Sequence, residues 1–197
     1  MCGFLIQEKK SIYNKKDKKL FINASKKIFH RGPDSRNYLF LRKKMVFHSR
    51  LKIIDLRNKA NQPFNRYGYS IIFNGEIYNF KTVKKELQNF FHFETNSDTE
   101  VLLLSYLKWK EKMFEKIEGM YSFVIINHIS NELFFARDLF GQKPLFYFKD
   151  NNQVIFASEI KPILKILGQK KNQINEKEIY KYLNFNYFGD EKDTFFK

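Results

Sequence analysis

The sequence places a cysteine directly after the initiator methionine, and Cys2 is the only cysteine in the 197 residues. Small residues at the second position favour removal of the methionine, which leaves Cys2 with a free α-amine. An α-amine has an ordinary pKa of about 7.7–8.0, so part of it is neutral at pH 7 and can accept the thiol proton. Cys2 is therefore a candidate nucleophile that carries its own base. The alternative is a small buried hydrophobic residue, which most free cysteines are.

Several polar clusters follow short apolar runs downstream of Cys2. They are HRGPDS (30–35), HSRLKIID (48–55), NQPF (61–64), FNGEIYN (73–79), SDTEV (97–101), ARDLFGQKPLFY (136–147) and FASEIKPIL (156–164). Together with Cys2, these clusters resemble the class II glutamine amidotransferase domain of the glutamine-hydrolysing asparagine synthetase family. The resemblance covers essentially the whole chain. It implies hydrolysis of L-glutamine to glutamate and ammonia through a thioester on Cys2.

Charged residues in these clusters match the two ends of a free amino acid. The resemblance implies that Arg50 binds the α-carboxylate of glutamine, since a guanidinium can fork onto a carboxylate; the alternative is a surface ion pair. It implies that Asp98 binds the α-ammonium group and that Glu76 assists there. The SDTE sequence is also a capping box, with Ser97 or Asp98 as the N-cap of a helix.

Asn74 and Gly75 correspond to the oxyanion hole of the family. The side-chain amide of Asn74 and the backbone N–H of Gly75 are implied to stabilise the negative oxygen of the tetrahedral intermediate. The alternative interpretation of an Asn-Gly pair is a hairpin turn. Backbone groups at Leu51, Ile53 and Ile54, above all the carbonyl of Ile53, are expected to line the pocket.

The elements that position these residues follow from the apolar pattern. Runs rich in β-branched and aromatic residues predict strands at 3–6, 38–41, 45–48, 69–73, 121–126, 132–136, 144–148 and 153–158. Helical spacing predicts helices ending near His30, around 83–87 and 101–107, and at 160–167 and 176–183. This mixture indicates an α+β protein. The resemblance implies a four-layer αββα sandwich of two mainly antiparallel sheets flanked by helices, the N-terminal nucleophile hydrolase fold.

The resemblance also predicts the domain organisation. We expect the amidotransferase domain at 2–167, and at 168–197 the start of a connection to a C-terminal synthetase domain that is absent from this chain. Synthetase domains of the family carry a Ser-Gly-Gly-type pyrophosphate loop, and the sequence has no Gly-Gly pair. ATP and Mg²⁺ are therefore expected only for the absent domain, and no cofactor is expected for glutamine hydrolysis.

The composition excludes several other functions. The net charge of +15 would suit a nucleic-acid-binding protein. The lysines are spread along the chain, however, and adjoin no nucleic-acid-reading motif, so this function is disfavoured. No apolar run approaches the length that spans a bilayer. One cysteine and four histidines without ligand spacing predict neither a disulfide nor a metal site, and a lone thiol favours the cytoplasm. His48 is expected to pack behind the site and not to act as a base.

Three questions stay open at this level. The ammonia acceptor is expected to be aspartate, with another carboxylate, such as a surface-polysaccharide sugar, as the alternative. A catalytically inert, truncated binding module is the second alternative, and a retained initiator methionine would favour it. The expected partners are L-glutamine and the synthetase domain, and a homodimer is compatible with the sequence.

Overall fold

Alternating apolar residues form two antiparallel sheets in the computed structural model, which describes residues 1–168, 174–186 and 194–196. The first sheet has the order β2-β3-β1-β9-β8 and the second the order β4-β5-β6-β7. The strands are β1 (Gly3–Lys9), β2 (Ser35–Phe40), β3 (Lys44–Arg50), β4 (Phe64–Arg66), β5 (Tyr69–Ile77), β6 (Gly119–Asn127), β7 (Leu133–Arg137), β8 (Phe146–Lys149) and β9 (Gln153–Ala157).

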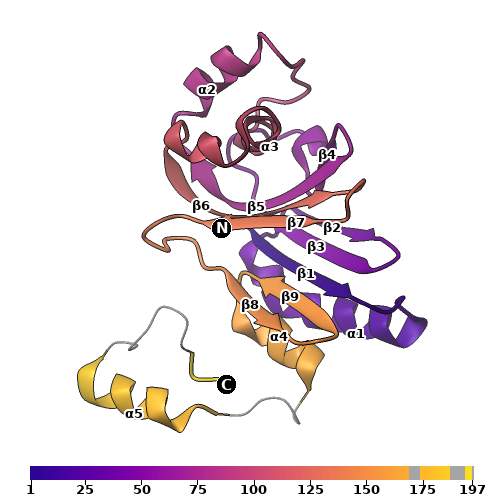
Figure 1. Ribbon diagram of the computed structural model, residues 1–197, viewed down its shortest axis with the longest axis vertical. Helices are drawn as coiled ribbons and strands as arrows, with labels where there is room; N and C mark the ends of the chain where they lie inside the picture. Colours follow the sequence, from indigo (N-terminus) through magenta and orange to yellow (C-terminus); the bar gives the residue numbers. More distant parts are fainter. Residues whose placement is uncertain (169–173, 187–193, 197) are drawn as a thin grey trace.

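Helices cover the outer faces of both sheets. They are α1 (Lys15–Ser25), α2 (Phe80–Leu87), α3 (Asp98–Trp109) and α4 (Ile160–Leu167). A further helix, α5 (Glu176–Phe185), lies apart from both sheets (Figure 1). Figure 1 shows α1 and α4 against the first sheet and α2 and α3 over the second, with the two sheets stacked between them. The predicted four-layer αββα arrangement is confirmed.

Strand β5 illustrates how the alternation divides the core. Ile71, Phe73 and Ile77 face α3, whereas Ile72 packs between the sheets beside Phe4 of β1. Successive side chains of a strand point to opposite faces, so Asn74 and Glu76 share the inner face with Ile72. The alternation thus turns two polar side chains toward the first sheet, at the end of the apolar layer.

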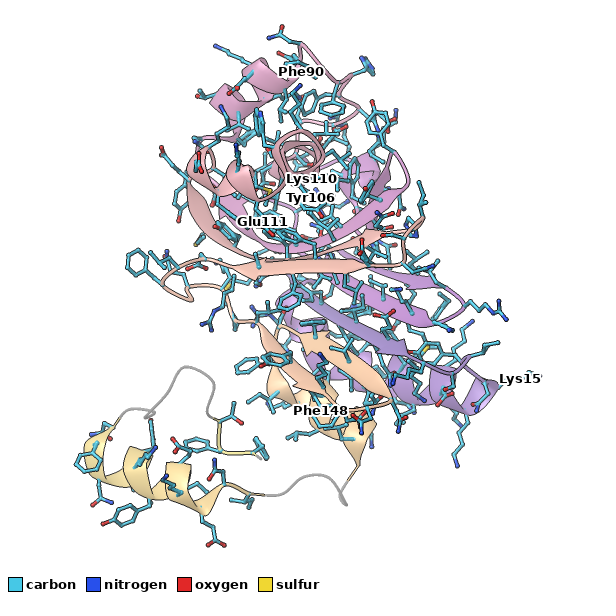
Figure 2. The ribbon with its side chains drawn as sticks, in the orientation of Figure 1. Lys15, Phe90, Tyr106, Lys110, Glu111 and Phe148 are labelled. Atoms are coloured by element: carbon cyan, nitrogen blue, oxygen red, sulfur yellow. The ribbon has the colours of Figure 1, made fainter. Side chains whose placement is uncertain are left out.

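Aromatic residues close the layer beneath α3. The Tyr106 ring stacks on Phe134 with a centroid separation of 4.5 Å, and the Lys110 ammonium lies 4.8 Å from the centre of the Tyr106 ring. Figure 2 shows Tyr106 and Lys110 on this side of the molecule and Phe148 by the opposite sheet. These rings account for part of the heavy aromatic content and fix α3 on its sheet.

The expected elements appear where the pattern predicts them, with two differences. The first helix ends at Ser25, and a 3₁₀ helix continues to Arg31, because Ile28 leaves helical geometry with φ −119°. The three-residue strand β4 was not predicted.

The C-terminal part of the chain is described only in segments. The expected connection at 168–197 includes 169–173, 187–193 and 197, which lie outside the described residues. In the remaining, described part of the chain, every helix is too short or too polar to cross a membrane.

Candidate active site

A cavity of about 310 Å³ lies where the start of β1, the ends of β3 and β5 and the start of α3 converge. Its wall contains every residue that the sequence singled out for the site: Cys2, Arg50, Leu51, Ile53, Ile54, Asn74, Gly75, Glu76 and Asp98. These residues come from both sheets and from a helix. The two-sheet packing therefore assembles one pocket from sequence positions that are far apart.

The predicted nucleophile, Cys2, lies just before the first residue of β1. The Cys2 thiol donates to the carbonyl of Leu51 with a sulfur–oxygen distance of 3.7 Å, and Arg31 Nε donates to the Cys2 carbonyl at 2.9 Å. Burial raises the pKa of the Cys2 thiol, so the resting group is protonated at neutral pH. Attack on a substrate therefore requires a base within reach of the sulfur.

The α-amine of Cys2 can be that base only after the preceding residue has left. Met1 lies on the cavity wall and 57% of its surface is exposed. Its peptide bond occupies the Cys2 nitrogen, so removal of Met1 both widens the pocket and frees the amine. His48 is fully buried, and its Nε2 lies 3.0 Å from the carbonyl of Phe73. Burial lowers the pKa of His48 to about 4, in agreement with a neutral packing role.

Gly75 presents its backbone N–H to the cavity side of β5. The N–H groups two residues before and after Gly75 are already hydrogen-bonded. The Phe73 N–H donates to Gln62 Oε1 at 2.6 Å, and the Ile77 N–H donates to Asp98 Oδ2 at 3.2 Å. Backbone N–H groups two residues apart on a strand point to the same edge. The Gly75 N–H therefore points to this edge as well, between two satisfied donors.

Asn74 supplies a second donor beside Gly75. The side chain is 1% exposed, and its Nδ2 has no hydrogen-bond partner among the described residues. Buried amide groups are nearly always paired, so a buried, unpaired donor on a cavity wall is suited to a ligand oxygen. Both residues lie inside the continuous strand β5, so the hairpin-turn interpretation is wrong.

Arg50 is buried at the end of β3 and held by neutral oxygens. Its Nη1 donates to the Arg57 carbonyl at 3.0 Å and to Asn61 Oδ1 at 2.9 Å, and its Nη2 donates to the Asp55 carbonyl. Within the described residues, no carboxylate forms an ion pair with Arg50. The guanidinium charge on the cavity wall is therefore not neutralised by a direct ion pair, and it can pair with a ligand carboxylate.

The opposite charge comes from the first turn of α3. Ser97 is the N-cap, with its side chain accepting from the Glu100 N–H, so Asp98 is left facing the cavity. Burial raises the pKa of Asp98 to about 6, with a further contribution from the charge of Glu76. At pH 7 the Asp98 carboxylate is ionised and poorly hydrated, which favours binding of a cationic group.

Other residues on the wall had been given no role. Among them, Asp55, Gln62 and Lys143 lie inside the quoted motifs and Met120 lies outside them. Gln62 is the most informative, because it accepts from the Phe73 N–H and donates to Thr99 Oγ1 at 3.2 Å. The NQPF motif was the available signal, but a glutamine that bridges a strand and a helix has no local pattern. Asp138, in the ARDLFGQKPLFY motif, holds a loop next to β6, because it accepts from the N–H of Tyr121, Gln142 and Lys143.

Comparison with known proteins agrees with this geometry. The sequence matches the glutamine amidotransferase domain family over residues 1–197. It is 39% identical over 197 residues to asparagine synthetase [glutamine-hydrolyzing] 1 of Bacillus subtilis, covering 95% of this chain and 30% of that protein. It is 37% identical over 171 residues to asparagine synthetase [glutamine-hydrolyzing] 3 of the same organism, covering 83% of this chain and 27% of that protein.

A solved structure shares the fold. The glutamine phosphoribosylpyrophosphate amidotransferase of B. subtilis superposes with a TM-score of 0.66 at 18% identity, covering 84% of this chain and 43% of that one. The chain thus spans less than a third of the two synthetases and less than half of this structural neighbour.

Proposed function

The chain belongs to the glutamine amidotransferase family, and from that premise we propose that it hydrolyses L-glutamine with the Cys2 thiol as nucleophile. The observation that carries the proposal is the distribution of groups around one cavity. A thiol, two unpaired hydrogen-bond donors, a cation and an anion line the same 310 Å³ space. These are the groups required to hold a zwitterionic amino acid and to attack the amide at its far end.

The first half of the reaction forms a thioester. After Met1 is removed, the Cys2 α-amine takes the thiol proton, and the sulfur bonds to the side-chain carbonyl carbon of glutamine. The negative oxygen is stabilised by the Asn74 amide and the Gly75 N–H. The carbon–nitrogen bond of the amide then breaks. The protonated α-amine of Cys2 gives its proton to the leaving nitrogen, so that ammonia departs.

The second half regenerates the thiol. The same α-amine accepts a proton from water, and the resulting hydroxide attacks the thioester carbonyl. The oxyanion again lies at Asn74 and Gly75, and its collapse releases glutamate and the Cys2 sulfur, which recovers a proton from the amine. Arg50 and Asp98 hold the α-carboxylate and α-ammonium of the substrate throughout, so their binding energy serves orientation. No metal or organic cofactor is assigned a step.

The remainder of the function concerns a longer protein. Residues 2–167 would form the amidotransferase domain, and 168–197 would begin the connection to a synthetase region. Relatives that are more than three times as long as their match to this chain support this division. The ammonia would be used there, with ATP and Mg²⁺, to amidate aspartate in the cytoplasm; another carboxylate acceptor is the alternative. A homodimer remains a prediction.

The test is glutamate release from L-glutamine by the purified 197-residue chain, with N-terminal mass spectrometry to establish that Met1 has been removed. A Cys2→Ala variant prepared in the same way is the control. The proposal expects turnover in the processed chain and none in the variant. A processed, folded chain that releases no more glutamate than the variant would overturn it and favour an inert binding module.

A further inference from the structure

The two groups proposed to hold the ends of the amino acid belong to different layers of the fold. Arg50 ends β3 in the first sheet, whereas Asp98 begins α3, which lies over the second sheet. A ligand that contacts both groups requires a fixed separation between them. Among the described residues, no hydrogen bond or ion pair joins either side chain to the other's element, and the segment between β3 and β4 is hydrogen-bonded to both sides.

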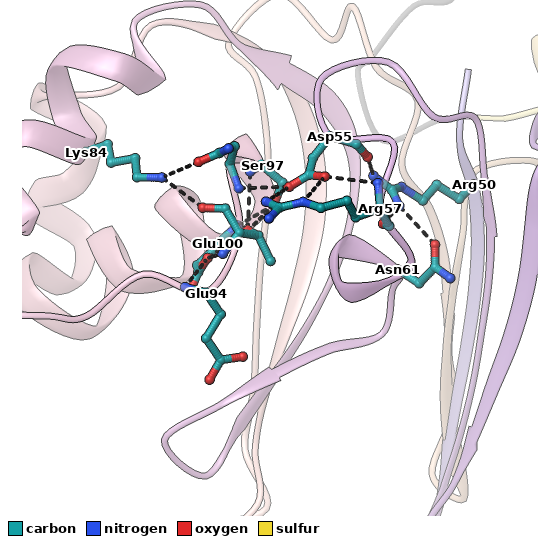
Figure 3. Close-up of polar contacts among 10 residues, drawn as sticks. Arg50, Asp55, Arg57, Asn61, Lys84, Glu94, Ser97 and Glu100 are labelled. Atoms are coloured by element: carbon teal, nitrogen blue, oxygen red, sulfur yellow. Dashed lines mark hydrogen bonds and ion pairs between the residues drawn. The ribbon is translucent and has the colours of Figure 1, made fainter.

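Asp55 lies in this segment and holds Arg50 through its main chain. Its carbonyl accepts from Arg50 Nη2. The Arg57 carbonyl and Asn61 Oδ1, farther along the same segment, accept from Arg50 Nη1. The main chain of Asp55 therefore supplies one of the oxygens that hold the guanidinium of Arg50. Figure 3 shows Arg50 between Asp55 and Asn61.

The carboxylate of Asp55 holds the other side. Its side chain is 3% exposed, and Oδ2 accepts from the Asn96 N–H at 2.8 Å and from Arg57 Nη2 at 2.6 Å. Oδ1 accepts from the backbone N–H and Nε of Arg57 at 3.0 and 2.9 Å. Asn96 is two residues before Asp98, so this carboxylate is bound to the loop that leads into α3. Hydrogen bonds from Arg57 hold the pKa of Asp55 well below its ordinary value, so the carboxylate is charged at any pH of interest.

The loop that contains Asn96 is held by further hydrogen bonds. Glu100 accepts from the N–H groups of Glu94 and Thr95, and Lys84 donates to the Thr95 carbonyl at 2.8 Å and to Asn96 Oδ1 at 3.0 Å. Figure 3 shows these contacts continuing from Asp55 toward α2 and α3. Because these contacts hold the loop, we expect a displacement of Asp55 to move Asp98 as well. A second bridge, from Gln62 to Thr99, is uncharged.

We propose that Asp55 is a positioning residue that fixes the separation between Arg50 and Asp98 and so couples the two anchors of the amino-acid site. The proposal rests on the proposed function only for the identity of the ligand. Asp55 is not assigned a contact with the substrate. Its contribution should therefore be large for a ligand that uses both anchors and small for one that uses a single anchor.

The test measures binding in a Cys2→Ala background, so that turnover is not needed. Isothermal titration calorimetry gives Kd for L-glutamine and for glutaramate, the same amide without its α-amino group. An Asp55→Asn change removes the charge that binds Arg57 and the Asn96 N–H. We expect Kd for L-glutamine to rise about tenfold, because misplacement of one anchor costs orientation, and Kd for glutaramate to change less than about twofold.

Two further variants separate coupling from general damage. Asp17→Asn is the matched control. Asp17 also forms an ion pair, with Lys9 at 2.6 Å, and belongs to the capping box of α1. It lies near the end of β1 that is remote from Cys2. It should leave both Kd values unchanged. Arg57→Gln keeps the Arg57 backbone groups but removes the ion pair, so its effect on Kd for L-glutamine should lie between wild type and Asp55→Asn. This variant also serves if Asp55→Asn does not fold.

Equal losses for L-glutamine and glutaramate, no loss for either, or an Arg57→Gln effect larger than that of Asp55→Asn would overturn the coupling. So would a Cys2→Ala chain that does not bind L-glutamine. Failure of the proposed function has a different signature. A chain that binds L-glutamine but releases no glutamate would contradict catalysis and leave the binding comparison intact.

Discussion

Replacement of Asn74 by alanine should lower glutaminase activity strongly and change the stability of the fold little. The Asn74 side chain is 1% exposed, and its Nδ2 has no hydrogen-bond partner among the described residues. Loss of one oxyanion-hole donor typically lowers kcat by about 10²–10³, equivalent to about 2.7–4 kcal/mol of transition-state stabilisation. We expect that loss for Asn74→Ala, with a smaller change in KM, because the amide acts on an oxygen that becomes negative only in the transition state.

The same substitution should cost little folding free energy. An unpaired buried amide is itself unfavourable by about 1–3 kcal/mol, and its removal offsets the packing lost with the side chain. The free energy of unfolding should therefore stay within about 1 kcal/mol of wild type, which corresponds to a shift in Tm of about 2–4 °C or less. Steady-state glutaminase kinetics and thermal denaturation on one preparation measure both quantities.

Asn79 provides the matched comparison. Its Nδ2 donates to the Lys116 carbonyl at 2.8 Å and its Oδ1 accepts from the Glu118 N–H at 3.0 Å, outside the cavity wall. Asn79→Ala should lower stability by about 1–2 kcal/mol, because it leaves partners unpaired, and should not change kcat. A result in which Asn74→Ala keeps its kcat, or loses activity only in proportion to a loss of folded protein, would refute the assignment of the oxyanion donor.

Three further predictions concern the remaining groups of the site. Cys2→Ser should reduce glutamate release to the level of Cys2→Ala, because a hydroxyl is far less nucleophilic than a thiol; turnover near wild type would exclude the thioester. Since burial raises the pKa of Asp98 to about 6, KM for glutamine should rise as pH falls from 7 to 5, and Asp98→Asn should show a high KM without that dependence. The native protein holds this proton more tightly than the unfolded chain, so the Asp98 contribution to stability falls as pH rises from about 4 to 6. Asp98→Asn should therefore raise the unfolding free energy at pH 7 by about 3 kcal/mol in urea titrations. Gly75→Ala should fail to fold or lose several kcal/mol, because a Cβ there would overlap the Met120 carbonyl oxygen; a normal Tm would contradict the strand geometry.

The sequence alone determined the elements with strong local patterns. β-Branched and aromatic runs predicted all strands except β4, and helical spacing predicted every helix from α1 to α5. These predictions succeed because strand and helix periodicities depend on near neighbours. The exceptions have local causes: three residues are too few for a period in β4, and the departure of Ile28 from helical geometry is not visible in the apolar stripe that includes it.

The sequence also predicted a nucleophile and its base, because both groups belong to the residue that follows the initiator methionine. The tertiary structure decided which other groups remain available to a ligand. The register with β6 leaves the N–H groups of Phe73, Gly75 and Ile77 at the other edge of β5. There Gln62 accepts from Phe73 and Asp98 accepts from Ile77, and the Gly75 N–H remains available to a ligand. The connection from Asp55 to Arg50 and Asn96 likewise arises only when the two sheets are packed. Such relations join residues that are distant in sequence, and no local period records them.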